Sequence, residues 1–530
     1  MGAMSRGLTI LMIGAALVSA CTEPGSLDGR CEALFGRDAR APARSSSGPA
    51  VPGSATADRK APDRPGRPRL LVLTDIGGEP DDSQSLVRLL VYASEFDVEA
   101  ILATTSAWLR DQVHGEIIQG HVSAYGEVRD NLLVHAPGYP TAEQLQARVA
   151  PCLPAYGLEG VGEGMDSEGS EFILRVLEAP DDRPLWITIW GGANCLAQSL
   201  WKLEQSRSPI EVDRLVSKVR VYAISDQDDS SQCLRGAFPE LSYIVSPSDQ
   251  GYQDYRKATW WGISGDDLAS NLPKAAFCRP LEAMGRRCTR LIRGPRLEIV
   301  DNPWLAEHIR SHGPLGARYP AVRYIMEGDT PSFLNLIGNG LAAHLRPDWG
   351  GWGGRYELLR PEGEPRKIWT NADDEVLAPD GGTYRTNHAT VWRWREAFQH
   401  DFAARMDWSI SERFADANHN PILIVNGDGS KEPIEIRARP DESVRLSASG
   451  SRDPDPDDRI RYHWWQYREA GSHPSRVSIP APEAETVEVV VPDDAAGSIL
   501  QIILEATDDG TPPLTSYRRI LIDATPPVAR

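Results

Sequence analysis

The sequence predicts two folded parts: an α/β domain with a mostly parallel sheet and helices on both faces, then an all-β sandwich. Over residues 69–418, short apolar segments with strand spacing alternate with segments of helical spacing, a pattern typical of parallel sheets. From about residue 421, alternating apolar residues form short strands between Asp, Gly and Pro turns, which is typical of a sandwich. The 530 residues are enough for both parts.

The same spacing predicts the elements in order. In the α/β part we expect strands over residues 70–73, 98–103, 132–136, 185–190 and 219–224. Helices are expected over residues 83–92, 112–125, 172–177 and 391–406, and the last of these closes the domain. In the sandwich we expect strands over residues 443–449, 459–467, 486–491, 499–506 and 517–523.

The N-terminus has the pattern of an export signal. Arg6 precedes an apolar stretch at 8–18 that is too short to span a membrane comfortably. The small residues before Cys21 resemble a bacterial lipobox. We therefore expect residues 1–21 to be a lipoprotein signal, with lipid on Cys21 anchoring the protein to the outer membrane or cell surface; a plain signal peptide is the alternative. Residues 22–68, rich in Ala, Pro, Ser and Gly, are expected to be a disordered tether.

Charge and cysteine content restrict the partners. The net charge of −19 argues against nucleic acid, whose phosphates require basic surfaces. The chain has seven cysteines without zinc-type spacing. Export permits disulfides, and Cys278 with Cys288 is the nearest pair and the first candidate. Equally favoured is that most cysteines are small buried apolar residues.

Acidic residues gather where the first predicted strand ends. Asp75 follows the strand at 70–73, and Asp81 and Asp82 open the helix at 83–92 after a Gly/Pro turn. Ligands bind at this end of parallel strands. Clustered carboxylates repel each other, and a hard cation relieves the repulsion; Ca²⁺ suits a flexible all-oxygen site better than Mg²⁺. The alternative is a solvated acidic turn.

The segment Thr-Asp-Ile-Gly-Gly-Glu-Pro-Asp-Asp at 74–82 resembles the calcium motif of nucleoside hydrolases, Asp-x-Asp-x-x-x-Asp-Asp. Its longer turn resembles specifically the nucleoside-hydrolase-like domain of the Sde182 cellulose-binding family. If Asp75 takes the place of the second motif acid, Leu73 replaces the first. The resemblance implies a nucleoside-hydrolase-like α/β domain over 69–418 and a sandwich of immunoglobulin or polycystic-kidney-disease (PKD) type over 419–530.

The resemblance also implies site residues elsewhere. The metal ligands would be Asp75, Asp82, the carbonyl of Ala193, and Asp329. Substrate contacts would come from Asp81, Asn194, Asp226, Gln227, Asp228 and Glu327. Gly328 stands where nucleoside hydrolases often carry a His that protonates the leaving base. For residues 190–197 a plain glycine turn remains open, and for residues 225–230 an exposed acidic loop.

Two further groups have both a functional and a structural interpretation. Trp349 and Trp352 lie in a Gly-rich loop, where their rings could stack on sugars; a place in the core is equally open. Asp453, Asp455, Asp457 and Asp458 in the sandwich could bind Ca²⁺, and turn formation is the favoured interpretation.

The leading hypothesis is a Ca²⁺-dependent hydrolase of N-glycosidic or glycosidic bonds, in which Asp75 takes a proton from water and Asp81 binds a sugar hydroxyl. The partner would be a sugar-containing small molecule or a polysaccharide. The alternative is a non-catalytic protein that binds cellulose-like polysaccharide, favoured by Gly328, by Leu73 and by the Trp/Gly loop. A purely structural surface protein ranks last, since it leaves the acidic cluster unexplained.

Overall fold

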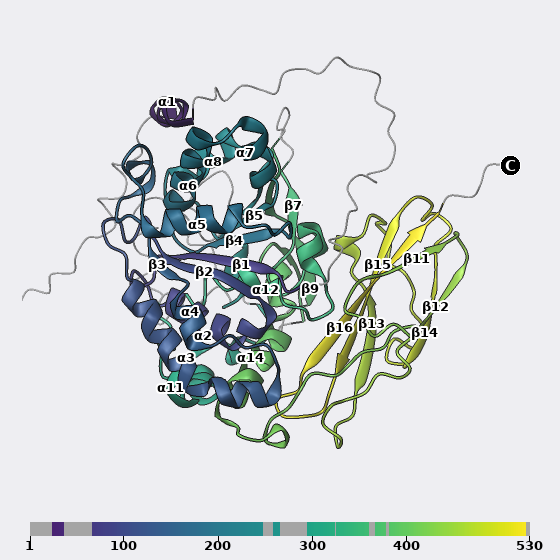
Figure 1. The fold of residues 1–530 in the computed structure, drawn as a ribbon. Helices are drawn as coiled ribbons and strands as arrows, with labels where there is room; N and C mark the ends of the chain where they lie inside the picture. Colours follow the sequence, from purple (N-terminus) through teal and green to yellow (C-terminus); the bar gives the residue numbers. More distant parts are fainter. Residues whose placement is uncertain are drawn as a thin grey trace, which may run out of the picture.

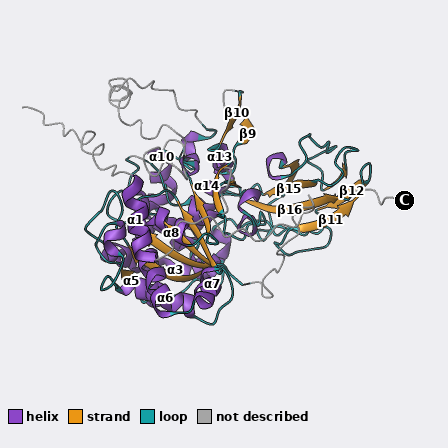
Figure 2. Ribbon diagram, turned by 90° about the horizontal axis from the view of Figure 1, so that it is seen from above, coloured by secondary structure: helices purple, strands orange, loops and turns teal. Residues whose placement is uncertain are grey.

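The computed structural model of the protein describes residues 24–35, 66–246, 258–264, 294–323, 325–359, 366–377 and 381–525. An α/β domain and a β domain lie side by side (Figures 1 and 2). Cys21, and Cys278 with Cys288, lie outside the described residues, so the predicted lipid anchor and the predicted bridge stay predictions.

A central sheet of eight strands organises the α/β domain in the order β3-β2-β1-β4-β5-β6-β8-β7. Neighbouring strands are parallel except β7 and β8, which are antiparallel. The strands are β1 Arg69–Thr74, β2 Asp97–Ala103, β3 Val149–Pro151, β4 Leu185–Ile189, β5 Val219–Ala223, β6 Ser242–Val245, β7 Tyr356–Leu358 and β8 Ile368–Asn371. A hairpin of β9 (Asp374–Leu377) and β10 (Thr383–Thr386) is separate. The predicted mostly parallel sheet is confirmed.

Helices cover both faces of this sheet (Figure 1). One face carries α2 Asp81–Val91, α3 Gly115–His135, α4 Ala142–Gln146, α11 Gly313–Gly316 and α14 Arg395–Ile410. The other carries α5 Glu168–Glu178, α6 Asn194–Ser206, α7 Pro209–Val216 and α8 Ser230–Ala237. Short helices α10 Asn302–Leu305, α12 Pro331–Leu334 and α13 Ala389–Trp392 lie in the connections.

Strand β1 shows why the sheet needs both layers. Leu70 and Val72 pack into the core that contains α2 and α3, whereas Leu71 and Leu73 pack into the core that contains α5 and α6. Alternate side chains of a strand point to opposite faces. A strand that is apolar throughout is therefore stable only between two helical layers.

Two expectations about secondary structure are wrong. Residues 132–136 are not a strand but mostly the last turn of α3, where Leu132 and His135 continue the buried side of the helix. A short apolar run alone cannot distinguish the two structures. Within the predicted tether, Pro24–Phe35 forms helix α1. Its Phe35 packs edge-on against Phe238, at 5.7 Å between ring centroids.

Two disulfides join segments that are distant in sequence. Cys31 of α1 is bonded to Cys233 of α8, and Cys152, directly after β3, is bonded to Cys195 of α6. For these four residues, the alternative of unpaired buried cysteines is wrong. The first disulfide fixes α1 to the α/β domain, which explains why this part of the Ala/Pro-rich stretch is ordered.

The C-terminal domain is a sandwich of a four-stranded sheet, in the order β11-β16-β15-β13, and the pair β12-β14. Its strands are β11 Ile434–Ala438, β12 Ser443–Ser447, β13 Arg461–Gln466, β14 Thr486–Val490, β15 Ile499–Thr507 and β16 Thr515–Ala524. Leu446, Val489 and Leu504 are among the residues of the apolar core between the two sheets. The predicted sandwich is confirmed.

The Gly-rich Trp loop lies where the two domains meet. Trp352 is 1% exposed and packs edge-on against Tyr517 of β16, at 6.3 Å between ring centroids. This burial favours the place in the core that the sequence left open for Trp352, and its sugar contact stays a prediction. Trp349 is half-buried, with the Arg519 guanidinium 5.4 Å from its ring centroid, so its sugar contact stays a prediction.

Gly340 is a second close contact with β16. It has φ +94°, and a Cβ there would lie 1.8 Å from the Tyr517 carbonyl oxygen.

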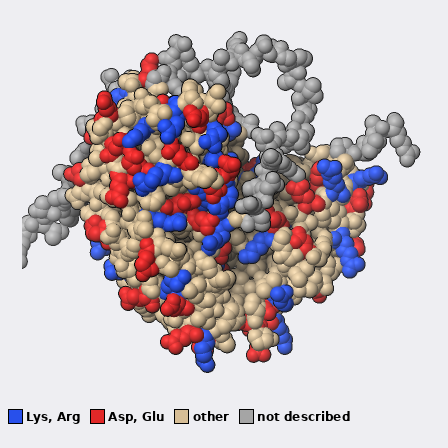
Figure 3. All heavy atoms as spheres, in the orientation of Figure 1, with Lys and Arg blue, Asp and Glu red and all other residues tan. Residues whose placement is uncertain are grey.

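The surface shows both signs of charge. On the face seen in Figure 3, acidic and basic side chains are interspersed over both domains. Within the part of the chain that the structure describes, no helix combines the length and the apolar character needed to cross a bilayer.

Candidate metal centre

Three elements bring acidic side chains together beyond the end of β1. Asp75 follows β1, Asp81 and Asp82 begin α2, and Asp329 lies in the loop before α12. Carboxylate oxygens of Asp81, Asp82 and Asp329 lie within 4.8 Å of one another. All four side chains are buried. This is a triple-Asp cluster that can hold a metal ion, with Asp75 beside it.

Glycines make room for these carboxylates. A Cβ at Gly191, which follows β4, would lie 2.8 Å from Oδ1 of Asp75. A Cβ at Gly328 would lie 2.8 Å from Oδ2 of Asp81, and the Asp81 carboxylate accepts a hydrogen bond from the Gly328 backbone. Any larger residue at 328 would therefore displace Asp81.

The cluster has no internal counter-charge. Burial, followed by the charge of Asp81, raises the pKa of Asp75 to about 7, against the lowering effect of a hydrogen bond with Ser106. Burial raises the pKa of Asp81 to about 6. Burial and the neighbouring carboxylates raise the pKa of Asp82 and of Asp329 well above the ordinary value. Among the described residues these four acids form no ion pair, so a bound cation would stabilise their charged forms.

The donor set fits a hard cation. Oδ2 of Asp329 is buried without a hydrogen-bond partner in the described structure. The Thr74 hydroxyl donates to Oδ1 of Asp82, and the Ile76 N–H donates to the Thr74 hydroxyl at 3.1 Å. Ser332 fixes the Asp329 loop by donating to the Asp329 carbonyl oxygen at 2.6 Å. Buried carboxylates with one oxygen left unpaired match the requirements of a hard, oxygen-binding cation.

The turn between Asp75 and Asp81 forms one wall of a pocket of about 400 Å³. Opposite lie residues 320–323, which include Arg323. The lining residues are Gly77, Gly78, Glu79, Pro80, Pro320, Ala321 and Arg323. Pockets of this size accept small molecules, and this one lies on the turn that joins Asp75 to Asp81.

Two predicted substrate contacts are used inside the protein. Glu327 is fully buried and accepts two hydrogen bonds from the Arg88 guanidinium, at 2.5 and 3.1 Å. Asp226 is buried in a bidentate pair with Arg235, at 2.6 and 2.8 Å. Their carboxylates neutralise buried arginines, and the predicted sugar contacts of Glu327 and Asp226 stay predictions. The Arg88–Glu327 pair instead ties α2 to the Asp329 loop.

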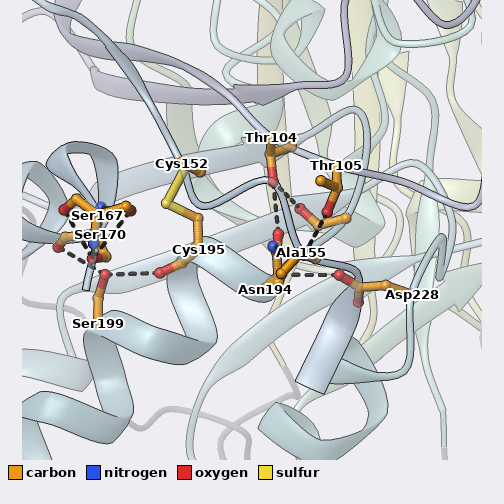
Figure 4. Close-up of a disulfide and its surroundings, with 11 residues drawn as sticks. Thr104, Thr105, Cys152, Ala155, Ser167, Ser170, Asn194, Cys195, Ser199 and Asp228 are labelled. Atoms are coloured by element: carbon orange, nitrogen blue, oxygen red, sulfur yellow. Dashed lines mark hydrogen bonds between the residues drawn. A yellow bond between two sulfur atoms is a disulfide. The ribbon is translucent and has the colours of Figure 1, made fainter. Parts of the chain in front are cut away.

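The segment after β4 is also committed to structure (Figure 4). The Asn194 amide accepts from Thr104 at 2.7 Å and donates to the Ala155 carbonyl oxygen at 2.8 Å. Asp228 accepts the Asn194 backbone N–H at 3.1 Å and the Ser230 hydroxyl at 2.6 Å. The side chains of Asn194 and Asp228 therefore fasten loops to the start of α6, and their sugar contacts stay predictions.

The roles of two other predicted residues, Ala193 and Gln227, stay open. The Ala193 carbonyl oxygen accepts the Ala197 N–H at 2.9 Å as the first bond of α6, so its role as a metal ligand stays a prediction. Gln227 donates to the Trp190 carbonyl oxygen, and its own amide oxygen is buried without a partner in the described structure. Its contact with a sugar also stays a prediction.

Sequence reasoning missed the polar residues after β2. Thr104, Thr105 and Ser106 continue that strand at the edge where Asp75 lies, and Ser106 hydrogen-bonds with Asp75. A signal was available, because β2 neighbours β1 in the sheet and polar residues at the ends of adjacent parallel strands meet. Glu79 was also missed as a site residue. Burial and the charges of Asp81 and Asp75 raise its pKa to about 8.

Comparison with known proteins covers both domains. The family model for the nucleoside hydrolase-like domain of cellulose-binding Sde182 matches residues 69–277 and 283–356. The model for the C-terminal domain of cellulose-binding protein Sde0182 matches residues 443–524. A solved structure from Saccharophagus degradans is 34% identical, covers 87% of this chain and 100% of its own, and has a TM-score of 0.71. It is described as a nucleoside hydrolase-related hypothetical protein associated with carbohydrate metabolism.

Weaker similarities accompany these matches. The type III effector XopQ, solved with adenosine diphosphate ribose, is 12% identical over 66% of this chain and 96% of its own, with a TM-score of 0.32. The PKD domain of the KIAA 1837 protein is 17% identical over 18% of this chain and 86% of its own, with a TM-score of 0.15. A search of curated proteins gave no match. The two family models and the Saccharophagus degradans structure show that this chain belongs to the Sde182 cellulose-binding family, with its nucleoside hydrolase-like domain and its C-terminal domain.

Proposed function

We propose that the protein is a Ca²⁺-dependent hydrolase of N-glycosidic or glycosidic bonds, acting on a sugar-containing small molecule or a polysaccharide. The observation that carries this proposal is the buried cluster of Asp81, Asp82 and Asp329 beside Asp75 at the end of β1. Acids that served only as a surface turn would be solvated and would not need to share one buried volume.

In this proposal Asp75, Asp82 and Asp329 hold the Ca²⁺. When bound, Ca²⁺ supplies a position for water and lowers the pKa of that water. Asp75 then accepts the proton of the attacking water, while Asp81 accepts a hydrogen bond from a sugar hydroxyl and orients the ring. Attack at the anomeric carbon breaks the bond to the leaving group through a transition state with oxocarbenium character; the leaving group departs with the bonding electron pair and takes a proton from solvent water.

The test is turnover by an Asp75→Ala variant on a panel of nucleosides and aryl glycosides, in buffer with Ca²⁺. General-base catalysis contributes about 10²–10⁴-fold, so we expect a loss of that size with the circular dichroism spectrum unchanged. Asp130→Ala is the matched control, because the Asp130 side chain is 98% exposed. Full activity of the Asp75→Ala variant on the best substrate would overturn the mechanism.

A second candidate is a non-catalytic carbohydrate-binding protein. It is favoured by Gly328 at the usual position of an acid-supplying His, and by Asp226 and Glu327, whose carboxylates are engaged by arginines. The family description names cellulose binding. Retention on insoluble cellulose without turnover on any glycosyl substrate would favour this candidate, whereas turnover that chelator abolishes would favour the hydrolase.

We also propose that the protein is exported and anchored to a bacterial membrane through lipid on Cys21. The two disulfides support export, because such bonds persist in oxidising compartments. Metabolic labelling with a fatty acid tests the anchor: wild type should be labelled and a Cys21→Ala variant should not. Equal labelling of both proteins would contradict it.

A further inference from the structure

A second acidic cluster lies in the sandwich domain, in the loop between β12 and β13. Carboxylate oxygens of Asp453, Asp455 and Asp458 lie within 4.8 Å of one another. The Asp455 N–H donates to Oδ1 of Asp453 at 2.9 Å, as expected for an Asp-based turn. That turn uses only one oxygen of Asp453, and the other oxygen, Oδ2, is buried without a partner in the described structure. Turn formation alone therefore does not account for the cluster.

Asp508, from a different part of the chain, supplies the independent observation. It follows β15 and its side chain is fully buried. Oδ1 of Asp508 accepts three hydrogen bonds, each at 3.0 Å, from the Gly510 and Leu514 N–H groups and from the Asn418 amide. Oδ2 of Asp508 is buried without a partner in the described structure. A buried carboxylate with one oxygen fully bonded and the other unpaired requires a cation or another donor.

Asp508 lies against the cluster. A Cβ at Gly510 would lie 2.5 Å from Oδ2 of Asp458, so the turn that begins at Asp508 touches that carboxylate. The charge of Asp508 is also among the causes that raise the pKa of Asp453, after burial. Among the described residues, the carboxylates of Asp453, Asp455 and Asp458 share one small volume, and Asp508 adjoins them with its own oxygen Oδ2 unpaired.

The same place is where the α/β domain ends. Asn418 donates to Asp508, and His419 donates its backbone N–H to Oδ2 of Asp455 at 2.8 Å. A ring nitrogen of His419 lies 3.0 Å from a ring nitrogen of His135, at the end of α3. Any ion held by the cluster would therefore stabilise the junction between α14 and the sandwich.

We propose that Asp453, Asp455, Asp458 and Asp508 bind one Ca²⁺ that fastens residues 418–419 to the sandwich domain. Ca²⁺ takes six to eight oxygen ligands in flexible geometry, which loops such as these can supply. Mg²⁺ requires near-ideal octahedral geometry and gives up its water reluctantly, so it fits less well. The site is separate from the centre beside β1, and its existence does not depend on any catalytic activity.

The test measures Ca²⁺ binding by isothermal titration calorimetry on the full chain. An Asp82→Asn/Asp329→Asn variant removes the centre beside β1, and we expect it to retain one Ca²⁺ site. Adding Asp453→Asn and Asp508→Asn should abolish that remaining binding. Adding Asp457→Asn instead should leave binding unchanged, because Asp457 is exposed in the same loop and lies outside the cluster.

A second measurement avoids reliance on the combined variants. In otherwise wild-type protein, Ca²⁺ at a hundredfold excess over Kd should raise the unfolding temperature of the sandwich by roughly 5 °C or more. The Asp453→Asn/Asp508→Asn variant should lose this shift, while Asp457→Asn should keep it. The proposal would be overturned if the heat of Ca²⁺ binding, or the Ca²⁺-induced rise in unfolding temperature, were the same with and without Asp453 and Asp508. Tighter binding of Mg²⁺ than of Ca²⁺ would also overturn it. None of these readouts uses turnover.

Discussion

Replacing Glu327 by Gln tests whether this residue is structural. Glu327 accepts hydrogen bonds from Arg88, from the Tyr319 hydroxyl at 2.7 Å and from the Thr330 hydroxyl at 2.8 Å. Gln keeps the shape but leaves the buried Arg88 guanidinium without its counter-charge. Gln also has an NH₂ group where Glu327 has one of its oxygens, and this donor would face the donors of Arg88, Tyr319 or Thr330.

The expected cost follows from this geometry. Removing one partner of a buried ion pair costs about 3–5 kcal/mol. Each donor left without an acceptor costs about 1–3 kcal/mol. These costs are already part of the roughly 3–5 kcal/mol for the ion pair and are not added to it. Arg88 still donates to the Phe398 carbonyl oxygen at 3.0 Å, which keeps part of its network. We therefore expect the free energy of unfolding of Glu327→Gln to fall by about 3–5 kcal/mol.

Urea unfolding at a fixed Ca²⁺ concentration, followed by tryptophan fluorescence, measures this loss. Glu298→Gln is the matched control: Glu298 is 64% exposed and pairs with the exposed Arg296. Surface pairs contribute about 1 kcal/mol or less, so the control should stay near wild type. A Glu327→Gln protein of wild-type stability but weakened substrate affinity would refute the reasoning and restore the role in substrate binding that the sequence suggested.

Three further predictions concern stability. Gly340→Ala should lower the free energy of unfolding by more than about 1 kcal/mol in urea, through its positive φ and its approach to the Tyr517 carbonyl. Trp352→Ala should lower the free energy of unfolding by about 3–5 kcal/mol and leave retention of the folded protein on cellulose unchanged. In the presence of a chelator, the free energy of unfolding measured in urea should fall as the pH rises from about 4 to 7. Over this range the folded protein holds protons on Asp75 and Asp81 that the unfolded chain releases. Added Ca²⁺ should flatten this dependence on pH.

Local patterns were enough to predict the first part of the site. Asp75, Asp81 and Asp82 lie within eight residues of one another, and a strand, a turn and a helix place them without help from the rest of the chain. Asp329 required the family resemblance, since its approach to α2 depends on the Arg88–Glu327 pair, 239 residues apart in sequence. Spacing alone contains no information on such a contact.

Buried charges explain why spacing alone did not reveal the structural roles of several polar residues. Arg88 belongs to a helix whose polar residues suggest a solvent face, and Asp226 to a run of acids that suggests an exposed loop. Both residues are buried because each meets an opposite charge from elsewhere in the fold. Trp352 could not be placed from its glycines, because flanking glycines can equally allow the backbone to approach the sandwich, as they do here, or leave a ring exposed.

The bond between Cys31 and Cys233 decides where mechanical load enters the protein. Force applied to residues before Cys31 passes through this covalent link into α8, and from there into the α/β domain. Strand β1 lies outside this covalent path while the link is intact. A pull from the N-terminal side therefore does not draw on the strand that leads into Asp75.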